Sequence, residues 1–352
     1  MKTIHVSASK EYDVLVERGL LHRCGALIRG VCRGQSAAVV ADETVWALYG
    51  EVVSKSLRES GFRVICCTFP AGEQEKTLET YAAVIRTLAA EKMSRSDCVV
   101  ALGGGVTGDL AGFVAASYMR GIDFVQIPTT LLAAVDSSVG GKTAVDLDEG
   151  KNLVGAFYQP RLVLCDPDTL ATLPPEQFRA GMAEVIKYGM IGDEDFLNSL
   201  LARPAAEHLE EVIAACVAMK RDVVSRDEVE QGERRLLNFG HTVGHAVERC
   251  CGFALSHGEA VAIGMAVLSR AAVNKGYCGE ETLTRLLQAL QQYDLPVETD
   301  CTVEELSAAA LADKKRSGDK LRLVVPERVG GCRIETIAAE SFREWLKAGG
   351  VQ

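Results

Sequence analysis

Residues 98–109 read CVVALGGGVTGD, and this stretch indicates the fold more directly than any other. An apolar run at 98–102 leads into four glycines, and an apolar stretch with helical periodicity follows at 106–116. A strand, a glycine-rich turn and a helix N-terminus form an anion site, because bare N–H groups and the helix dipole face the ligand. Gly103, Gly105 and Gly108 also satisfy G-x-G-x-x-G. The stretch predicts a dinucleotide-binding turn; the alternative is a tight turn that needs positive φ.

The sequence on both sides of this stretch alternates β-branched apolar runs with amphipathic stretches, which is typical of βαβ units. Strands are predicted at 37–41, 63–69, 98–102, 124–127 and 162–165, with helices at 45–60, 78–91 and 106–116. The fold class is therefore α/β, with a Rossmann-like, mostly parallel sheet.

The pattern of apolar residues changes after Pro174 and Pro175, where long segments with helical periodicity begin. A helix is predicted at 176–190, with Pro175 as its first residue, and strands return only at 321–325 and 332–336. The 352 residues also exceed the size of one typical core. We predict two domains, 1–172 (α/β) and 173–352 (mainly helical, all-α in class).

Composition excludes several classes of protein. The net charge of −10 disfavours a general nucleic-acid or anionic-membrane surface. No long apolar run or signal peptide is visible, which predicts a cytoplasmic location without membrane contact. The twelve cysteines are scattered through apolar segments, as at Cys66, Cys67, Cys98, Cys165 and Cys216, and we interpret most as buried thiols.

A second glycine cluster reads DSSVGGKT at 136–143, followed by Lys151 and Asn152. It ends like a phosphate-binding loop of ATPases, but Asp136 stands where that motif requires its first glycine, so the ATPase interpretation fails. A flexible loop with Lys142, Lys151 and an amide suits a phosphate ester. A solvated basic loop is the alternative.

Histidines and a carboxylate with metal-ligand spacing occur in the second half. His241 and His245 are four residues apart, so they face the same way on a helix and can share a metal; they could also be packing histidines. Glu184 and Lys187 share one helix face. His257 precedes an apolar helix, where a neutral imidazole is favoured over a cationic one. Spacing leaves open which two histidines would join a carboxylate on the metal.

These motifs jointly resemble the 3-dehydroquinate synthase family of sugar phosphate cyclases. The resemblance rests on 103–109, 136–143, GKNLVGAFYQP at 150–160, AEVIK at 183–187 and LNFGHTVGHAVE at 237–248, in matching order along nearly the whole chain.

The resemblance implies cofactors and the residues that hold them. Zinc, with Co2+ as a possible substitute, would be bound by Glu184, His241 and His257. NAD would be held by Asp42, Glu73, Lys76, Gly104, Gly105, Asp109, Thr129, Thr130, Lys142, Lys151, Thr169 and Thr172.

The resemblance also implies substrate-binding and catalytic residues. Catalytic roles fall on His245, Lys142, Glu230, Lys187 and Asp136. Substrate contacts fall on Arg120, Lys142, Asn152, Lys187, Lys220, Arg234, Asn238, His245 and either Lys314 or Lys315. Lys220 and Arg234 match positions that bind a carboxylate, and Arg120 would reach the site of a partner subunit, which implies a homodimer. One departure is Asp146, where we expect asparagine; a carboxylate there should weaken anion binding unless it points away.

The implied activity is conversion of 3-deoxy-D-arabino-heptulosonate 7-phosphate to 3-dehydroquinate and phosphate, in the shikimate pathway to chorismate and aromatic amino acids. The implied steps are transient oxidation by NAD, phosphate elimination, reduction and intramolecular aldol closure. The alternatives are another sugar phosphate cyclase or a metal-dependent polyol dehydrogenase. A non-catalytic NAD- or zinc-binding protein is a third, disfavoured by the chemical positions that are intact.

Overall fold

The computed structural model describes residues 1–312 and 320–352, and the chain forms two compact units. The first comprises 1–173 and 209–229, and the second comprises 174–208 and 230–352. The predicted division at 172 assigns 209–229 to the second domain, whereas these residues belong to the first compact unit. Helix α7 (Leu209–Arg226) packs there against strands β1 and β2.

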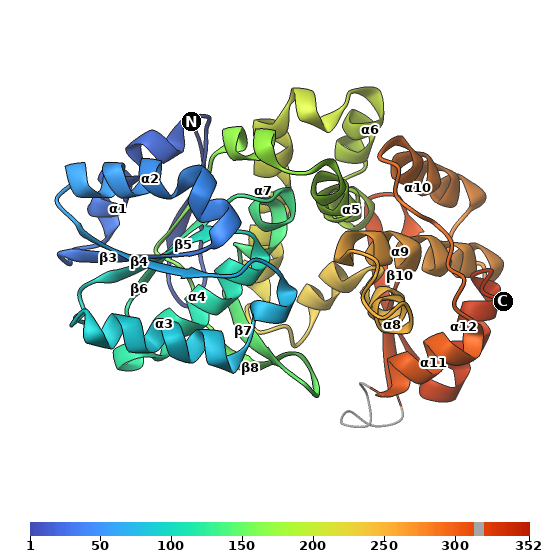
Figure 1. Cartoon of the computed structure of the whole chain (residues 1–352). Coiled ribbons are helices and arrows are strands. Elements are labelled where there is room, and N and C mark those ends of the chain that lie inside the picture. The colour runs from blue at the N-terminus through green and yellow to red at the C-terminus, as the bar shows by residue number, and fades with distance from the viewer. Residues whose placement is uncertain (313–319) are drawn as a thin grey trace. The chain divides into compact units, whose positions relative to one another are not determined.

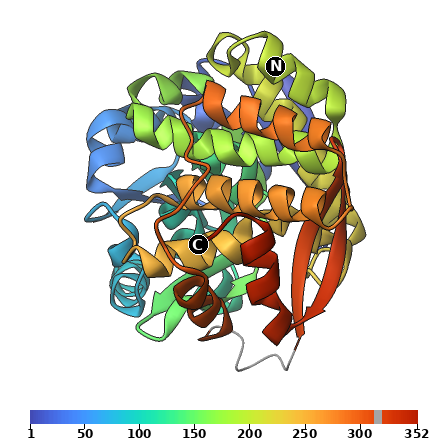
Figure 2. The same ribbon diagram turned by 90° about the vertical axis from the view of Figure 1, so that its right-hand side faces the viewer.

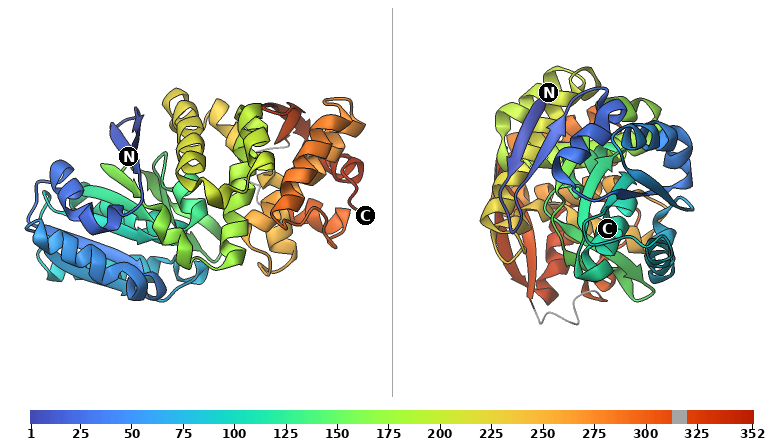
Figure 3. Two further views of the ribbon diagram at one scale, coloured as in Figure 1. Left: turned by 90° about the horizontal axis from the view of Figure 1, so that it is seen from above. Right: turned by 90° about the vertical axis from the view of Figure 1, so that its left-hand side faces the viewer.

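The first unit is built on a seven-stranded sheet with the order β1-β2-β9-β6-β5-β3-β4. All neighbouring strands run parallel except β1 and β2. The strands are β1 (Lys2–Val6), β2 (Tyr12–Val16), β3 (Ser36–Asp42), β4 (Arg63–Phe69), β5 (Cys98–Gly103), β6 (Asp123–Pro128) and β9 (Leu162–Cys165). The five strands predicted in this part of the chain are confirmed, and the prediction missed the N-terminal pair, drawn in dark blue in Figure 3.

Helices cover both faces of this sheet (Figure 1). They are α1 (Cys24–Val31) and α2 (Glu43–Glu59) on one face, and α3 (Leu78–Ala90) and α4 (Gly105–Ser117) on the other. Successive residues of a strand point to opposite faces. Accordingly, Val39 lies in the core cluster that holds Ile28 and Val53, whereas Val40 lies in the cluster that holds Leu88 and Leu110. Burial on both faces explains why β3 reads as a continuous apolar run.

The segment predicted as a flexible phosphate-binding loop is largely a β-hairpin. Strands β7 (Lys142–Leu147) and β8 (Gly150–Phe157) pair antiparallel. The prediction of a loop was wrong because β7 packs against α4, which buries Thr143 and Val145 and favours an extended strand. Lys142 begins β7, and Lys151 and Asn152 lie in β8.

The second unit is mainly helical (Figure 2). Its helices include α5 (Pro175–Gly192), α6 (Glu194–Ala202), α8 (His241–Cys250), α9 (His257–Asn274), α10 (Glu280–Gln292), α11 (Val303–Ala312) and α12 (Phe342–Ala348). The predicted strands near the end of the chain are confirmed as the hairpin of β10 (Lys320–Arg328) and β11 (Gly331–Ala338). Within 1–312 and 320–352, no helix combines the length and apolar character needed to cross a membrane.

Two glycines let helix α9 approach its neighbours closely. A Cβ atom on Gly258 would lie 2.0 Å from the carbonyl oxygen of Ala180 in α5. A Cβ atom on Gly264 would lie 2.0 Å from the carbonyl oxygen of Gly240, the residue before α8. Any side chain at either position would separate the helices. The close contacts hold the start of α9 against α5 and the middle of α9 against the start of α8.

The prediction that most cysteines are buried thiols holds for six of the twelve, which are Cys24, Cys32, Cys67, Cys98, Cys165 and Cys216. Cys250 and Cys301 form a disulfide across 51 positions of sequence, a pairing that depends on tertiary contact. Cys66 is exposed, whereas Cys67 is buried, because neighbouring residues of β4 point to opposite faces.

Candidate active site and metal centre

The first unit places predicted cofactor residues where the strand order of its sheet reverses. The chain passes from β3 to β4 on one side and then to β5 on the other side of β3. In α/β sheets, ligands bind beyond the carboxyl ends of the strands at such a point. Here β3 ends at Asp42, and β5 is followed by Gly104, which precedes α4 without any side-chain cap. Asp42, Gly104 and Gly105 therefore lie at this position.

The end of the neighbouring strand β6 packs against the glycine turn. The backbone N–H of Thr129 donates a 3.0 Å hydrogen bond to the carbonyl oxygen of Gly103. A Cβ atom on Gly104 would lie 3.0 Å from the methyl carbon of Thr130. The N-cap of α4 is Gly104, and no side chain caps its first N–H groups, as an anion site requires.

A buried polar network joins further predicted residues in the first unit. Lys76 is 3% exposed, and its Nζ donates 2.6 Å hydrogen bonds to Oδ2 of Asp109 and to Oδ1 of Asn152. Asn152 in turn donates its backbone N–H to Oδ1 of Asp146, at 2.6 Å. Burial raises the pKa of Asp109, and the Lys76 ammonium opposes that shift. Lys76 therefore links a predicted cofactor ligand to a predicted phosphate ligand.

The other predicted cofactor residues also belong to the first unit. Lys151 Nζ lies 3.7 Å from Oε1 of Glu73. Tyr49 in α2 donates its hydroxyl hydrogen to the carbonyl oxygen of Thr169 at 2.9 Å and lies 2.5 Å from Oγ1 of Thr172. The two contacts of Tyr49 tie the 167–172 turn to α2.

Asp136 and Lys220 form a pair that the sequence did not indicate. Asp136 lies in η4 (Ala133–Ser137), one turn of π-helix, and Lys220 lies in α7. The Lys220 ammonium contacts the carboxylate of Asp136 and donates to its backbone carbonyl oxygen at 2.8 Å. Although 84 positions separate them, both residues belong to the first unit.

The second unit brings Glu184, His241 and His257 together from α5, α8 and α9. Oε1 of Glu184 lies 3.6 Å from Nε2 of His241 and 3.4 Å from Nε2 of His257. One ligand atom from each residue can be chosen so that all three lie within 4.8 Å of one another. Glu184 is 1% exposed, and the ammonium of Lys187, one turn along α5, contacts its carboxylate. The three residues form a candidate metal site.

The donor atoms fit a divalent ion such as Zn2+ or Co2+. Two imidazole nitrogens and one carboxylate oxygen are the ligand types of open zinc sites, which keep one position for substrate or water. Nδ1 of His241 lies 3.2 Å from the carbonyl oxygen of Phe239, so a hydrogen on Nδ1 leaves the Nε2 lone pair facing Glu184. Burial lowers the pKa of His241 to about 3, which keeps this ring neutral, as a ligand must be.

His257 differs from its sequence-based interpretation as a neutral imidazole. Burial acts to lower its pKa, but interactions with Glu184 and Glu248 raise the pKa to about 9. The preference for a neutral ring at a helix N-terminus is therefore overridden by two nearby carboxylates. A metal ion at Glu184 would replace a proton at this ring.

Glu248 is a residue near the metal group to which sequence reasoning assigned no role. It is buried in α8, and Oε2 lies 3.7 Å from Nδ1 of His257 and 4.0 Å from Nε2 of His245. His245, Glu248 and His257 form a second group with possible ligand atoms within 4.8 Å. The available signal was spacing: Glu248 follows His245 by three residues and so shares its helix face.

The remaining predicted residues are distributed as follows. Arg234 is buried in η7 (Glu233–Asn238), and Nδ2 of Asn238 donates a 2.5 Å hydrogen bond to Oε1 of Glu230. His245 is half exposed near the other two histidines. Arg120 is exposed in the first unit and has a φ of 68°. Lys314 and Lys315 lie outside the described residues.

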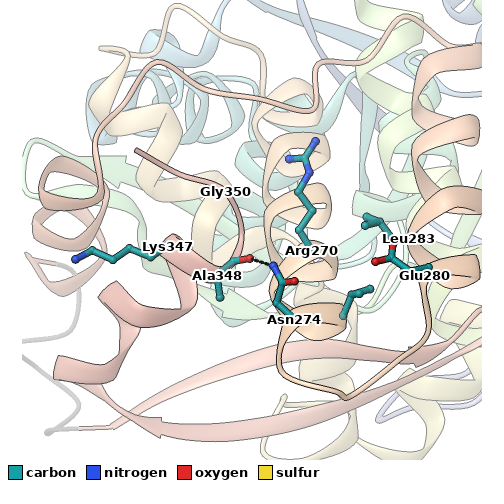
Figure 4. Close-up of a pocket in the computed structure, with 8 residues that line it drawn as sticks. Arg270, Asn274, Glu280, Leu283, Lys347, Ala348 and Gly350 are labelled. Atoms are coloured by element: carbon teal, nitrogen blue, oxygen red, sulfur yellow. Dashed lines mark hydrogen bonds between the residues drawn. The ribbon is translucent and has the colours of Figure 1, made fainter.

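A separate pocket of about 310 Å³ lies in the second unit, lined by Arg270, Val273, Asn274, Glu280, Leu283, Lys347, Ala348 and Gly350 (Figure 4). Asn274 donates a hydrogen bond to the carbonyl oxygen of Ala348 across it. None of the predicted site residues lines this pocket, so the volume alone does not locate the chemistry.

Comparison with solved structures defines the class of protein. The chain has a TM-score of 0.88 and 27% identity with a 2-deoxy-scyllo-inosose synthase solved with carbaglucose-6-phosphate, NAD+ and Co2+, over 98% of this chain and 99% of that one. It has a TM-score of 0.86 and 31% identity with a 2-epi-5-epi-valiolone synthase from Streptomyces hygroscopicus subsp. jinggangensis 5008 with NAD+ and Zn2+ bound, with the same coverage. The fold is thus that of the sugar phosphate cyclases.

Sequence comparison then gives the family. The model described as 3-dehydroquinate synthase N-terminal matches residues 66–180, and the one described as 3-dehydroquinate synthase C-terminal matches 181–316. A 3-dehydroquinate synthase of Enterococcus faecalis (strain ATCC 47077 / OG1RF) is 44% identical over 358 aligned positions, covering all of both chains. The chain belongs to the 3-dehydroquinate synthase family, and it is an enzyme, a lyase of the shikimate pathway.

Proposed function

We propose that this chain forms 3-dehydroquinate and phosphate from 3-deoxy-D-arabino-heptulosonate 7-phosphate, with NAD and a Zn2+ or Co2+ ion as cofactors. The observation that carries the proposal is the convergence of Glu184, His241 and His257 in a full-length member of this family. Two related cyclases bind NAD+ together with Co2+ or Zn2+. This supports the same pair of cofactors here.

The proposed residues divide the work of holding the cofactors and the substrate. Glu184, His241 and His257 would hold the metal, and the residues around Asp42, Gly104 and Asp109 would hold NAD. When bound, the metal would polarise a substrate oxygen, and NAD would accept and return a hydride.

The other proposed residues act on the substrate itself. Lys142, Asn152, Asn238 and His245 would bind the phosphate, and Lys220 and Arg234 the carboxylate. Lys187 and Asp136 would orient hydroxyl groups, and Glu230 would move protons. Positioned cations stabilise charge that develops on the departing phosphate.

The direct test is phosphate release by purified protein with NAD and Zn2+, with NADH absorbance followed in parallel. We expect phosphate release with no net NADH, loss of activity with a chelator and recovery on adding Zn2+. Sedoheptulose 7-phosphate and glucose 6-phosphate serve as carboxylate-free controls. Net NADH without phosphate would indicate a polyol dehydrogenase instead, and turnover of a control substrate alone would indicate another cyclase.

We also propose that the enzyme is a homodimer in which Arg120 reaches the phosphate site of the partner subunit. Arg120 is exposed, and its left-handed backbone presents the side chain at a turn. Mixing an inactive Arg120→Ala protein with an inactive Lys142→Ala protein should restore activity, because mixed dimers contain one intact site. Failure of mixed dimers to regain activity would contradict this arrangement. A cytoplasmic location remains a prediction from the sequence.

A further inference from the structure

The ring of His257 lies between two carboxylates that approach its two different nitrogen atoms. Nε2 is 3.4 Å from Oε1 of Glu184, and Nδ1 is 3.7 Å from Oε2 of Glu248. The two nitrogens of one imidazole point away from each other, so they cannot bind the same ion. A metal bound on the Glu184 side leaves Nδ1 with its hydrogen directed at Glu248.

The Glu184 side is the better site for the ion. There, Nε2 of His241 and Nε2 of His257 both approach the same carboxylate oxygen, at 3.6 and 3.4 Å. Three electron-rich atoms converge, and only a proton or a cation holds such atoms together. On the Glu248 side the corresponding contacts are longer, and His245 is 51% exposed, against 14% for His241.

We propose that Glu248 is a positioning residue that accepts a hydrogen bond from Nδ1 of His257 and so directs the Nε2 lone pair at the metal. Metal-bound histidines usually donate their second N–H to a carboxylate or carbonyl, which fixes the ring and makes it a stronger ligand. The carbonyl of Phe239 has this role for His241, and Glu248 has it for His257. The 3.7 Å distance is longer than a hydrogen bond, so the proposal requires this contact to shorten when the ion is bound. The inference rests on the proposed metal site.

The test is the affinity of the metal-free protein for Zn2+, measured by competition with a chromophoric chelator, for Glu248→Leu and Glu248→Gln. We expect the leucine variant to bind Zn2+ about 10- to 100-fold more weakly, the range for loss of such a partner. The glutamine variant should lie between it and the wild type, since an amide oxygen still accepts the hydrogen bond without the charge. Visible absorption of the Co2+-loaded variants should shift, because the ligand set is retained while the imidazole becomes less basic.

Glu259→Gln is the matched control. It makes the same chemical change two residues from His257, but the Glu259 carboxylate caps the start of α9 through Ser256, a role that glutamine also performs. Its Zn2+ affinity should equal that of the wild type. Thermal unfolding of the metal-free proteins separates loss of metal affinity from loss of the fold; if the leucine variant unfolds, the glutamine variant provides the measurement.

Three outcomes would overturn the inference or its basis. Wild-type Zn2+ affinity in both Glu248 variants would show that Glu248 does not act on the metal. If His245→Ala loses Zn2+ binding and His241→Ala keeps it, the ion is bound by His245, Glu248 and His257, and Glu248 is a metal ligand rather than a positioning residue. Zn2+ binding that persists with wild-type affinity in a Glu184→Ala variant would instead contradict the proposed metal site itself.

Discussion

The ammonium of Lys220 donates a 2.8 Å hydrogen bond to the backbone carbonyl of Asp136 and contacts the carboxylate of the same residue. The cation that the sequence assigns to the substrate carboxylate therefore already has an internal anion. The prediction that Lys220 binds the substrate carboxylate therefore requires the substrate to share this ammonium with Asp136. The pair thus couples two predicted substrate contacts, one to the carboxylate and one to the hydroxyls.

We expect Lys220→Met to lower kcat/KM for the acidic substrate by about 30- to 1000-fold, since losing one member of a buried charge pair costs about 2–4 kcal/mol. Adding Asp136→Asn to the Lys220→Met variant should recover stability without recovering activity. The second change removes the unpaired carboxylate but restores no cation. Steady-state kinetics and urea unfolding of both single variants and the double variant measure this. A Lys220→Met protein with the wild-type KM would refute the carboxylate assignment.

Lys76→Met should weaken NAD binding about 10- to 100-fold, as expected for loss of hydrogen bonds worth about 1.5–3 kcal/mol to a charged group. Burial already raises the pKa of Asp109, and removal of Lys76 favours the protonated acid, which donates rather than accepts. Calorimetric titration with NAD gives the affinity. The exposed Lys55→Met variant, with the same loss of charge, should bind NAD normally. Equal affinity in the two variants would exclude Lys76 from the cofactor site.

Asp146→Ala should raise KM for the sugar phosphate about 2- to 10-fold with a smaller effect on kcat, because one hydrogen bond contributes about 0.5–1.5 kcal/mol. The Asp146 carboxylate accepts the N–H of Asn152, whose φ is 57°, so it holds the conformation of a predicted phosphate ligand. Asp146→Asn keeps an acceptor oxygen and should behave nearly as the wild type. The exposed Asp148→Ala variant is the control. A lower KM in Asp146→Ala would mean that the carboxylate repels the substrate.

Asp97→Asn should lower the free energy of unfolding by about 1–3 kcal/mol at pH 7, the cost of leaving a buried donor unsatisfied. Burial opposes ionisation of Asp97, but hydrogen bonds from Ser94, Ser36 and Gln35 hold the pKa of its carboxyl below the ordinary value. Because the folded pKa is depressed, this stability is present above the ordinary pKa and is lost as pH falls through the folded value.

Urea unfolding of wild type and Asp97→Asn at several pH values measures that difference. The two curves should converge only in acid. Asp300→Asn, at an exposed position, should follow the wild type at every pH. A difference between wild type and Asp97→Asn that does not change with pH would exclude the carboxylate charge as its cause.

The elements predicted most accurately from sequence are those whose burial leaves a clear apolar pattern within a short segment. The run at 98–102 and the helix after its glycines were identified because both faces of β5 are covered and the turn requires small residues. The strands at 2–6 and 12–16 were missed. β1 lies at the edge of the sheet and carries exposed polar residues, whereas β2 is buried between β1 and β9 but only five residues long, so each gives a weak signal. The β7–β8 hairpin was predicted as a loop because its lysines and glycines suggest one.

Local sequence was sufficient for the α/β class, the glycine turn and a set of candidate metal ligands, because periodicity, turn chemistry and ligand type are properties of short segments. Which two histidines join Glu184 was implied by the family resemblance and not by local spacing. Only the tertiary structure decided which atoms meet. It brought Glu184 to His241 and His257, paired Asp136 with Lys220 across 84 positions, and set Glu248 beside His257. The tertiary structure also raises the pKa of His257, whereas its place before a helix predicted a neutral ring. The reason is that the pKa of a side chain depends on the charges that folding places around it.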